Sequence, residues 1–206
     1  MHTKRIIETG IPRYKASKAL IMLHGRGASA NDILSLQSSL DVKDFYIAAP
    51  QAMNSTWYPY SFLAPITDNE PWLTSAIELV GDIVVDIEKA GITSDKIFIL
   101  GFSQGACLSL EFSTRNARKW GGVISFTGGL IGDKIYKGNY GGDFKGTKVF
   151  IGNSDHDPHV PLVRSEESKK VMTQMGASVN LAVYPNMSHT INKEEIEIAN
   201  QILNSQ

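Results

Sequence analysis

The sequence has little of several features on which large classes of protein depend. Its 206 residues contain one cysteine, Cys107, which excludes an internal disulfide framework and any zinc site built from cysteines alone. The 20 basic residues (Lys and Arg) and 21 acidic residues (Asp and Glu) nearly cancel, for a net charge of −1 with no basic block. No nucleic-acid partner is therefore expected, because nucleic-acid binding depends on clustered positive charge.

Long hydrophobic runs are also missing. No apolar stretch reaches the roughly 18 residues that a membrane-spanning helix needs. The opening residues, MHTKRIIETG, lack the apolar core of a signal peptide. We therefore expect a cytoplasmic protein with no stable membrane insertion. No repeat, low-complexity segment or linker divides the chain, so we expect residues 1–206 to form a single domain, with a homodimer left open.

Two patterns alternate along the chain. Short apolar runs that lack a period of two are typical of strands buried on both faces of a parallel sheet. They cover residues 18–23, 45–49, 96–100, 122–126, 147–151 and 180–184. Helical stretches over residues 71–90, 161–175 and 192–203 lie between or after them. This alternation predicts an α/β fold with a mostly parallel central sheet and helices on both faces.

Reactive side chains follow four of these predicted strands directly. They are His24 and Arg26 after the first, Ser103 after the third, the run Asp155 to His159 after the fifth, and His189 after the sixth. The carboxyl ends of parallel strands meet at one edge of a sheet, where ligands bind in such folds. We therefore expect a serine, an acid and a histidine to lie close together there.

Ser103 lies in the motif GFSQG (residues 101–105), between a predicted strand and a helix that starts with ACLSLEF. This context is typical of a sharp turn that displays a nucleophilic serine, with glycines where backbone approaches backbone. A serine hydroxyl needs an adjacent base to take its proton. His189 follows the next strand after the acidic loop and is the predicted base, whereas His24 is expected to brace the loop beside Gly25.

The acid that orients the histidine has two candidates, Asp155 and Asp157. We favour Asp157, because Pro158 and the Val160-Pro161 pair define the turn that follows it. Asp155 then remains to hold backbone amides of the loop. The run Asp155 to His159 is also dense in metal-ligand types, but Pro158 interrupts helical pairing of ligands. We expect no metal and no cofactor.

An oxyanion formed by attack on a carbonyl needs converging N–H donors. The backbone N–H groups of Gln104 and Arg26 are the predicted donors. Aromatic residues of the segment 55–72 either cover the sheet edge or form the wall of a substrate pocket; they are Trp57, Tyr58, Tyr60 and Phe62. The glycine-rich segment 128–146 is too short for a large lid, so an open site for small or medium acyl groups is expected.

Four segments together resemble the phospholipase/carboxylesterase family of α/β-hydrolases, which includes relatives of the acyl-protein thioesterases. They are LHGRGA (23–28), GFSQGA (101–106), SDHDPHVP (154–161) and the MSH that ends at His189. The resemblance implies an α/β-hydrolase fold without a large lid domain. It also implies Ser103 as nucleophile, His189 as base and Asp157 as the third member, with backbone donors at Arg26 and Gln104.

The function predicted from these observations is a serine carboxylesterase. It would cleave small-molecule esters through a Ser-His-Asp triad and an acyl-enzyme intermediate. Thioesterase or lysophospholipase activity on the same triad is one alternative. The others are a non-catalytic or very slow ligand-binding protein on the same fold, and a lyase or dioxygenase-like activity on a ring substrate.

Overall fold

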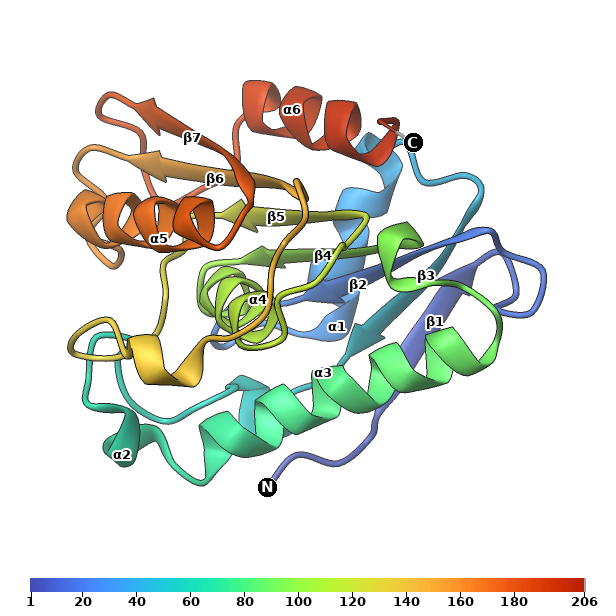
Figure 1. Cartoon of the computed structure of the whole chain (residues 1–206), viewed down its shortest axis with the longest axis horizontal. Coiled ribbons are helices and arrows are strands. Elements are labelled where there is room, and N and C mark those ends of the chain that lie inside the picture. Colours follow the sequence, from blue (N-terminus) through green and yellow to red (C-terminus); the bar gives the residue numbers. More distant parts are fainter. Residues whose placement is uncertain (206) are drawn as a thin grey trace.

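A seven-stranded sheet runs through the centre of the protein in a computed structural model that describes residues 1–205 (Figure 1). Its strands are β1 (Ile6–Gly10), β2 (Lys18–Leu23), β3 (Phe45–Pro50), β4 (Ile97–Phe102), β5 (Gly122–Phe126), β6 (Lys148–Ser154) and β7 (Ser178–Tyr184). They follow the order β1-β3-β2-β4-β5-β6-β7. Only β1 is antiparallel to its neighbour, so the predicted mostly parallel sheet is confirmed.

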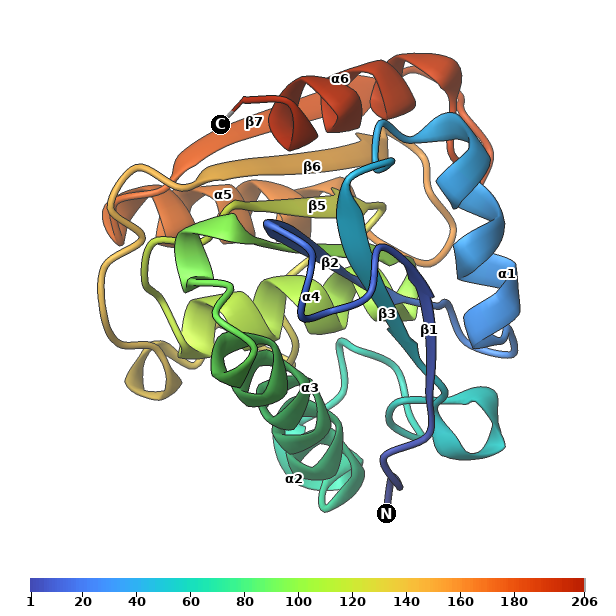
Figure 2. The same cartoon turned by 90° about the vertical axis from the view of Figure 1, so that its right-hand side faces the viewer.

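Helices cover both faces of this sheet (Figure 2). On one face lie α3 (Trp72–Lys89), α4 (Gln104–Arg115) and α5 (Leu162–Gln174), and on the other lie α1 (Ala30–Leu34) and α6 (Lys193–Leu203). The short α2 (Ile66–Asn69) precedes α3, and 3-10 turns occur at Ser35–Ser39, Met53–Ser55, Ser94–Lys96 and Lys137–Asn139. Within residues 1–205, no helix has the length and apolar character needed to cross a membrane.

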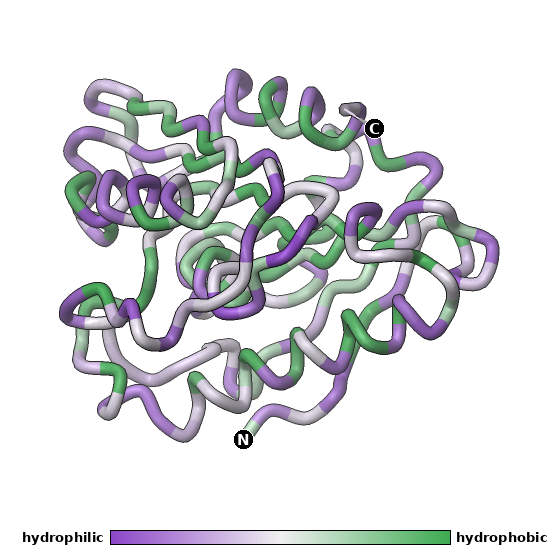
Figure 3. The backbone as a smooth tube through the Cα atoms, in the orientation of Figure 1, coloured by the Kyte–Doolittle hydropathy of each residue, from purple (hydrophilic) through white to green (hydrophobic). Residues whose placement is uncertain are grey.

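Side-chain alternation along the strands divides the core into two layers. In β4, Ile97 and Ile99 pack toward α3 and α4, whereas Phe98 and Leu100 pack toward α6. Helix α3 contributes apolar residues at helical spacing, among them Leu73, Ala76, Val80, Ile83 and Ile87. Figure 3 shows hydrophobic residues along the central strands and an alternation of hydrophobic and hydrophilic residues along α3.

The structure also contains elements that the pattern does not predict. The six expected strands are present and the four expected helices correspond to α3, α4, α5 and α6. Strand β1 is additional: it is a half-buried edge strand whose ladder with β3 pairs Ile6 with Pro50 and Gly10 with Tyr46. It has only a short apolar run of its own, so its pairing with β3 defines it.

The connection between β5 and β6 is held against the rest of the protein by hydrogen bonds. In the part of the chain that the structure describes, it forms no large lid. Two buried charges hold it. The Glu111 carboxylate accepts hydrogen bonds from the Ile131 N–H and the Tyr140 hydroxyl, both at 3.0 Å. The Arg164 guanidinium donates to the carbonyl oxygens of Leu130 and Gly132.

A third buried ionisable side chain, the Glu195 carboxyl group, lies at the start of α6, in the helix that follows the His189 loop. Its Oε2 accepts from the Asn192 N–H at 2.8 Å, whereas its Oε1 has no hydrogen-bond partner and lies against Gly152. Burial, reinforced by the charge of Glu194, raises the pKa of Glu195 from its ordinary value of 4.5 to about 7, although the Asn192 bond opposes this shift.

This raised pKa predicts a loss of stability as the pH rises. The folded protein binds the Glu195 proton more tightly than the unfolded chain, so the free energy of unfolding falls between about pH 4.5 and pH 7. We expect wild type to lose about 1–3 kcal/mol over that range from this group, and Glu195→Gln to lose correspondingly less. Urea unfolding at both ends of the range measures the difference. The exposed Glu166→Gln on α5 is the control, and equal slopes in all three proteins would contradict the prediction.

Candidate active site

Ser103 lies at the sharp turn between β4 and α4, beyond the carboxyl end of the strand. Its backbone has φ 54° and ψ −118°, a conformation that non-glycine residues rarely adopt. The Ser103 N–H donates to the Phe126 carbonyl at 3.0 Å, which ties the turn to the end of β5. Because the backbone is held this way, the hydroxyl is displayed above the sheet edge.

The two glycines of the motif are required by close backbone packing. A Cβ on Gly101, near the end of β4, would overlap the carbonyl of Gly105 in the first turn of α4. A Cβ on Gly105 would in turn overlap the carbonyl of Leu23 at the end of β2. The first turn of α4 therefore packs directly on the neighbouring strand, which brings the loop after β2 next to Ser103.

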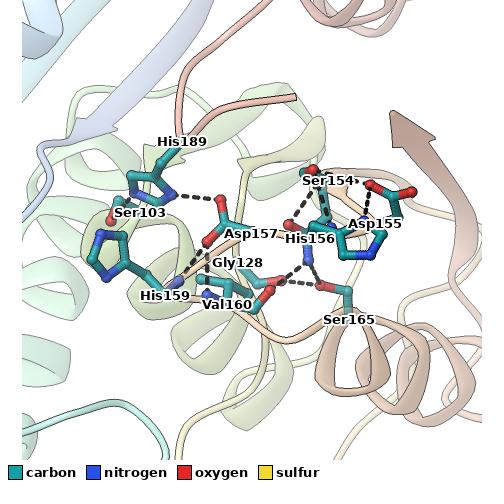
Figure 4. Close-up of polar contacts among 11 residues, drawn as sticks. Ser103, Gly128, Ser154, Asp155, His156, Asp157, His159, Val160, Ser165 and His189 are labelled. Atoms are coloured by element: carbon teal, nitrogen blue, oxygen red, sulfur yellow. Dashed lines mark hydrogen bonds and ion pairs between the residues drawn. The ribbon is translucent and has the colours of Figure 1, made fainter. Parts of the chain in front are cut away.

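His189 bridges Ser103 and Asp157, as Figure 4 shows. Its Nε2 lies 2.8 Å from the Ser103 Oγ, and its Nδ1 lies 2.7 Å from the Asp157 Oδ2. The three residues come from the loops after β7, β4 and β6 and meet at one sheet edge. The Asp157 carboxylate is fully buried, whereas the His189 side chain is 19% exposed. This arrangement can move a proton from the hydroxyl to the imidazole and stabilise the resulting cation.

The second oxygen of Asp157 is also fully used. Its Oδ1 accepts from the N–H groups of His159 and Val160, each at 2.8 Å. Burial alone would raise the pKa of Asp157, but the hydrogen bonds from His189, His159 and Val160 outweigh burial and lower it. The carboxylate is therefore ionised at neutral pH, as a partner for an imidazolium must be.

Asp155 lies apart from Ser103 (Figure 4). Its Oδ1 accepts from the Asn186 N–H at 2.8 Å and contacts the His156 Nδ1 at 2.9 Å, and these bonds lower its pKa in that order. Asn186 has φ 54°, a left-handed conformation that asparagine tolerates. Asp155 thus joins the loop after β6 to the loop that carries His189. It binds a backbone amide, which is the role predicted for it from the sequence.

Two backbone N–H groups near Ser103 have no acceptor among the described residues. Gln104 is the first residue of α4, so its N–H has no partner within the helix, and the Arg26 N–H makes no hydrogen bond within residues 1–205. Gly25 brings this backbone close, because a Cβ there would lie 3.5 Å from the Ser103 Cβ. The pair can serve as donors to an oxyanion.

The side chains of these same two residues hold the aromatic loop. Gln104 is buried, and its amide accepts from the Trp57 N–H at 2.9 Å and donates to the Tyr58 carbonyl at 2.8 Å. The Arg26 guanidinium donates to the carbonyl oxygens of Pro59 at 2.8 Å and Tyr60 at 2.6 Å. The sequence predicts a role only for their backbones, because side-chain contacts between residues 33 or more positions apart leave no local signal.

A cavity of about 480 Å³ opens beside Ser103. It is lined by Gly25, Arg26, Ala28, Tyr58, Pro59, Tyr60, Ser61, Phe62, Phe102, Ser103, Gln104, Cys107, His159, Val160 and His189. Three of the four aromatic residues singled out in the sequence therefore face it, namely Tyr58, Tyr60 and Phe62. The lining is mixed, because it contains apolar rings as well as the reactive groups.

Trp57 is the exception, because it is fully buried outside the lining. Its indole Nε1 donates to the His24 carbonyl at 2.8 Å, and its ring lies 4.9 Å from the His24 ring. His24 is fully buried as well, with its Nδ1 2.7 Å from the Gly25 carbonyl and its Nε2 accepting from the Ala52 N–H at 3.1 Å. Both side chains brace the loops around the site, and Trp57 is removed from the candidate substrate-binding residues.

Known proteins share this architecture. The sequence model of the family described as Phospholipase/Carboxylesterase matches residues 4–206. The chain belongs to that family. It is similar to a crystal structure of a phospholipase/carboxylesterase from Dyadobacter fermentans, with 53% identity, a TM-score of 0.97 and 98% of each chain covered.

Relatives with other activities in their names are more distant. Acyl-protein thioesterase 1 of Saccharomyces cerevisiae is 26% identical, with 88% of this chain and 89% of the relative covered. Lysophospholipase-like protein 1 of Mus musculus is 23% identical, with 96% and 89% covered. The Bacillus cereus carboxylesterase structure shares the fold alone, at 18% identity and a TM-score of 0.78, with 97% and 93% covered. This protein is thus a hydrolase of the phospholipase/carboxylesterase family, and the predicted α/β-hydrolase fold is confirmed.

The site of this phospholipase/carboxylesterase family member also contains residues that the sequence analysis did not select. The rings of Phe102 and His159 lie 5.1 Å and 4.9 Å from the His189 ring and confine it. Their positions in the sequence could have identified them, because Phe102 directly precedes Ser103 and His159 follows Asp157 by two residues. Cys107 is buried in the cavity wall, and burial raises the pKa of its thiol to about 12. It packs as a small neutral side chain.

The histidines and acids of this region do not converge on a common point. Asp157 faces His189, whereas Asp155 faces Asn186 and His156. Within residues 1–205, no group of three or more His, Cys, Asp or Glu side chains is arranged to hold a metal ion.

Proposed function

We propose that this protein is a serine carboxylesterase that cleaves small or medium acyl esters through an acyl-enzyme intermediate. The observation that carries the proposal is the position of His189, hydrogen-bonded at once to the Ser103 hydroxyl and the buried Asp157 carboxylate. No cofactor is needed in this mechanism. One sheet takes strands from both ends of the chain, which supports a single domain over residues 1–206.

The steps follow from the geometry. The His189 Nε2 takes the hydroxyl proton as the Ser103 Oγ attacks the ester carbonyl, and Asp157 stabilises the imidazolium. The N–H groups of Arg26 and Gln104 donate to the oxyanion that forms. His189 then gives its proton to the departing alcohol, which leaves the acyl group on Ser103. Water, deprotonated by His189, releases the acid in the second half-reaction.

The size and lining of the cavity support the substrate class. A volume of about 480 Å³ beside Ser103, walled by Tyr58, Tyr60 and Phe62 and not covered by a lid in the described residues, suits a small-molecule ester. Because relatives are named for thioesterase or lysophospholipase activity, those reactions remain alternatives on the same triad. Comparing kcat/KM for matched esters and thioesters distinguishes esterase from thioesterase activity.

Labelling with a fluorophosphonate probe tests the proposal. We expect one phosphonyl adduct, mapped by mass spectrometry to Ser103, because only an activated serine displaces the fluoride. The adduct should be lost in Ser103→Ala and reduced to background in His189→Ala. Ser61→Ala removes another hydroxyl of the cavity wall and should label like wild type. A folded wild-type protein that stays unlabelled would favour the ligand-binding alternative.

A further inference from the structure

The permanent charge of the cavity lining is of one sign, positive. In the part of the chain that the structure describes, the lining contains no aspartate, glutamate or lysine, and Arg26 is its only residue with a permanent charge. The two other basic side chains of the lining are His159 and His189. A single cation therefore faces the space beside Ser103 without an acidic side chain in the wall to balance it.

Arg26 also lacks an acidic partner elsewhere in the described chain. Four of the other five arginines are paired with an acid, for example Arg115 with Glu111 at 2.7 Å and Arg118 with Glu88 at 3.1 Å. Arg26 contacts only the neutral carbonyl oxygens of Pro59 and Tyr60, and its guanidinium lies 5.9 Å from the centre of the Tyr58 ring. These contacts hold the guanidinium in place but leave its charge uncompensated.

A guanidinium held in this way is preorganised to bind an anion. It presents several N–H donors in a rigid fork, and within residues 1–205 only two hydrogen bonds engage them. Because it is already ordered by Pro59 and Tyr60, a ligand that binds it loses little further side-chain entropy. The backbone N–H of the same residue is a proposed oxyanion donor, so the guanidinium lies within one side-chain length of the reacting carbonyl.

We propose that this site selects esters that carry an anionic group close to the scissile bond, with Arg26 binding that group. The inference rests on the proposed esterase function and names its substrate class. A carboxylate of the acyl part and a carboxylate of the alcohol part have the same chemistry, and both can be tested. Arg26 then determines specificity through its side chain while its backbone serves the chemistry.

The test compares kcat/KM for matched esters. Monoethyl succinate against ethyl pentanoate places the charge on the acyl side, and the butyrate ester of glycolate against ethyl butyrate places it on the alcohol side. We expect wild type to prefer the anionic member of at least one pair by about tenfold or more, as charge-assisted hydrogen bonds provide. The preference should weaken with added salt.

Variants of Arg26 test whether its side chain causes the preference for anionic esters. Arg26→Gln removes the charge and should lower the ratio of anionic to neutral kcat/KM by about tenfold to a hundredfold. Arg26→Lys keeps the charge without the fork and should give an intermediate ratio. Arg5→Gln removes one charge from an exposed residue outside the cavity lining and should leave the ratio unchanged.

The outcomes separate the two proposals. If neutral esters are cleaved as fast as anionic ones and Arg26→Gln changes both alike, the anion site is wrong and the esterase stands. If no ester is cleaved and no adduct forms with fluorophosphonate, the esterase proposal fails. Calorimetric titration of Ser103→Ala with monoethyl succinate then decides the anion site by itself. Binding that weakens at least tenfold on adding Arg26→Gln supports it, and binding that is absent or independent of Arg26 overturns it.

Discussion

Replacing Ser103 with alanine is expected to lower kcat for ester hydrolysis by about four to six orders of magnitude. The hydroxyl is the only nucleophile within hydrogen-bond distance of the His189 Nε2, at 2.8 Å, in the described residues. Without it no acyl-enzyme can form, and the residual rate comes from the oxyanion donors and from substrate binding. Steady-state rates on a chromogenic butyrate ester, with protein freed of wild-type contamination, measure the loss.

Ser103→Gly provides a matched control, because it removes the same hydroxyl and also relaxes the backbone. At φ 54° and ψ −118° a side chain strains the turn, so glycine is expected to raise the free energy of unfolding by up to about 1–3 kcal/mol. Alanine keeps the Cβ and should leave stability nearly unchanged. A variant that stays within tenfold of the wild-type kcat would refute Ser103 as the nucleophile.

Replacing Asp157 with asparagine is expected to lower kcat by about four orders of magnitude while leaving the fold intact. The asparagine oxygen can still accept from the N–H groups of His159 and Val160, so the turn keeps its bonds. Its NH₂ group would then face the His189 Nδ1 and place the imidazole proton on Nε2. In that tautomer the ring cannot take a proton from Ser103.

Asp155→Asn is the matched control for this experiment, two residues away in the same loop. Asp155 accepts from Asn186 and contacts His156, and neither bond reaches the Ser103–His189 pair. We expect less than about a tenfold change in kcat, with a modest loss of stability from the weakened loop contact. If Asp155→Asn were the more damaging substitution, the assignment of the acid would have to be exchanged. Circular dichroism and thermal unfolding would show that both variants are folded.

The sequence by itself determined the order of strands and helices and the location of the reactive residues. Buried parallel strands read as continuous apolar runs, and a strand followed by Gly-x-Ser-x-Gly and a helix has few structural solutions. Because the carboxyl ends of parallel strands share one edge, Ser103, His189 and the acidic loop could be expected to meet. Strand β1 was not predicted, since an edge strand of five residues depends on its partner β3.

The tertiary structure alone decided which side chain of each cluster faces the site. Asp155 and Asp157 have the same chemistry and lie in the same loop. The turn that follows Asp157 favours it as the acid, but the path of the folded chain is what directs its side chain toward His189. Trp57 and Tyr58 are adjacent aromatics, yet one braces His24 and the other lines the cavity. The bonds of Arg26 and Gln104 to the aromatic loop likewise join distant segments. Local sequence sets backbone conformation, whereas side-chain direction at a loop depends on contacts that exist only after the sheet has formed.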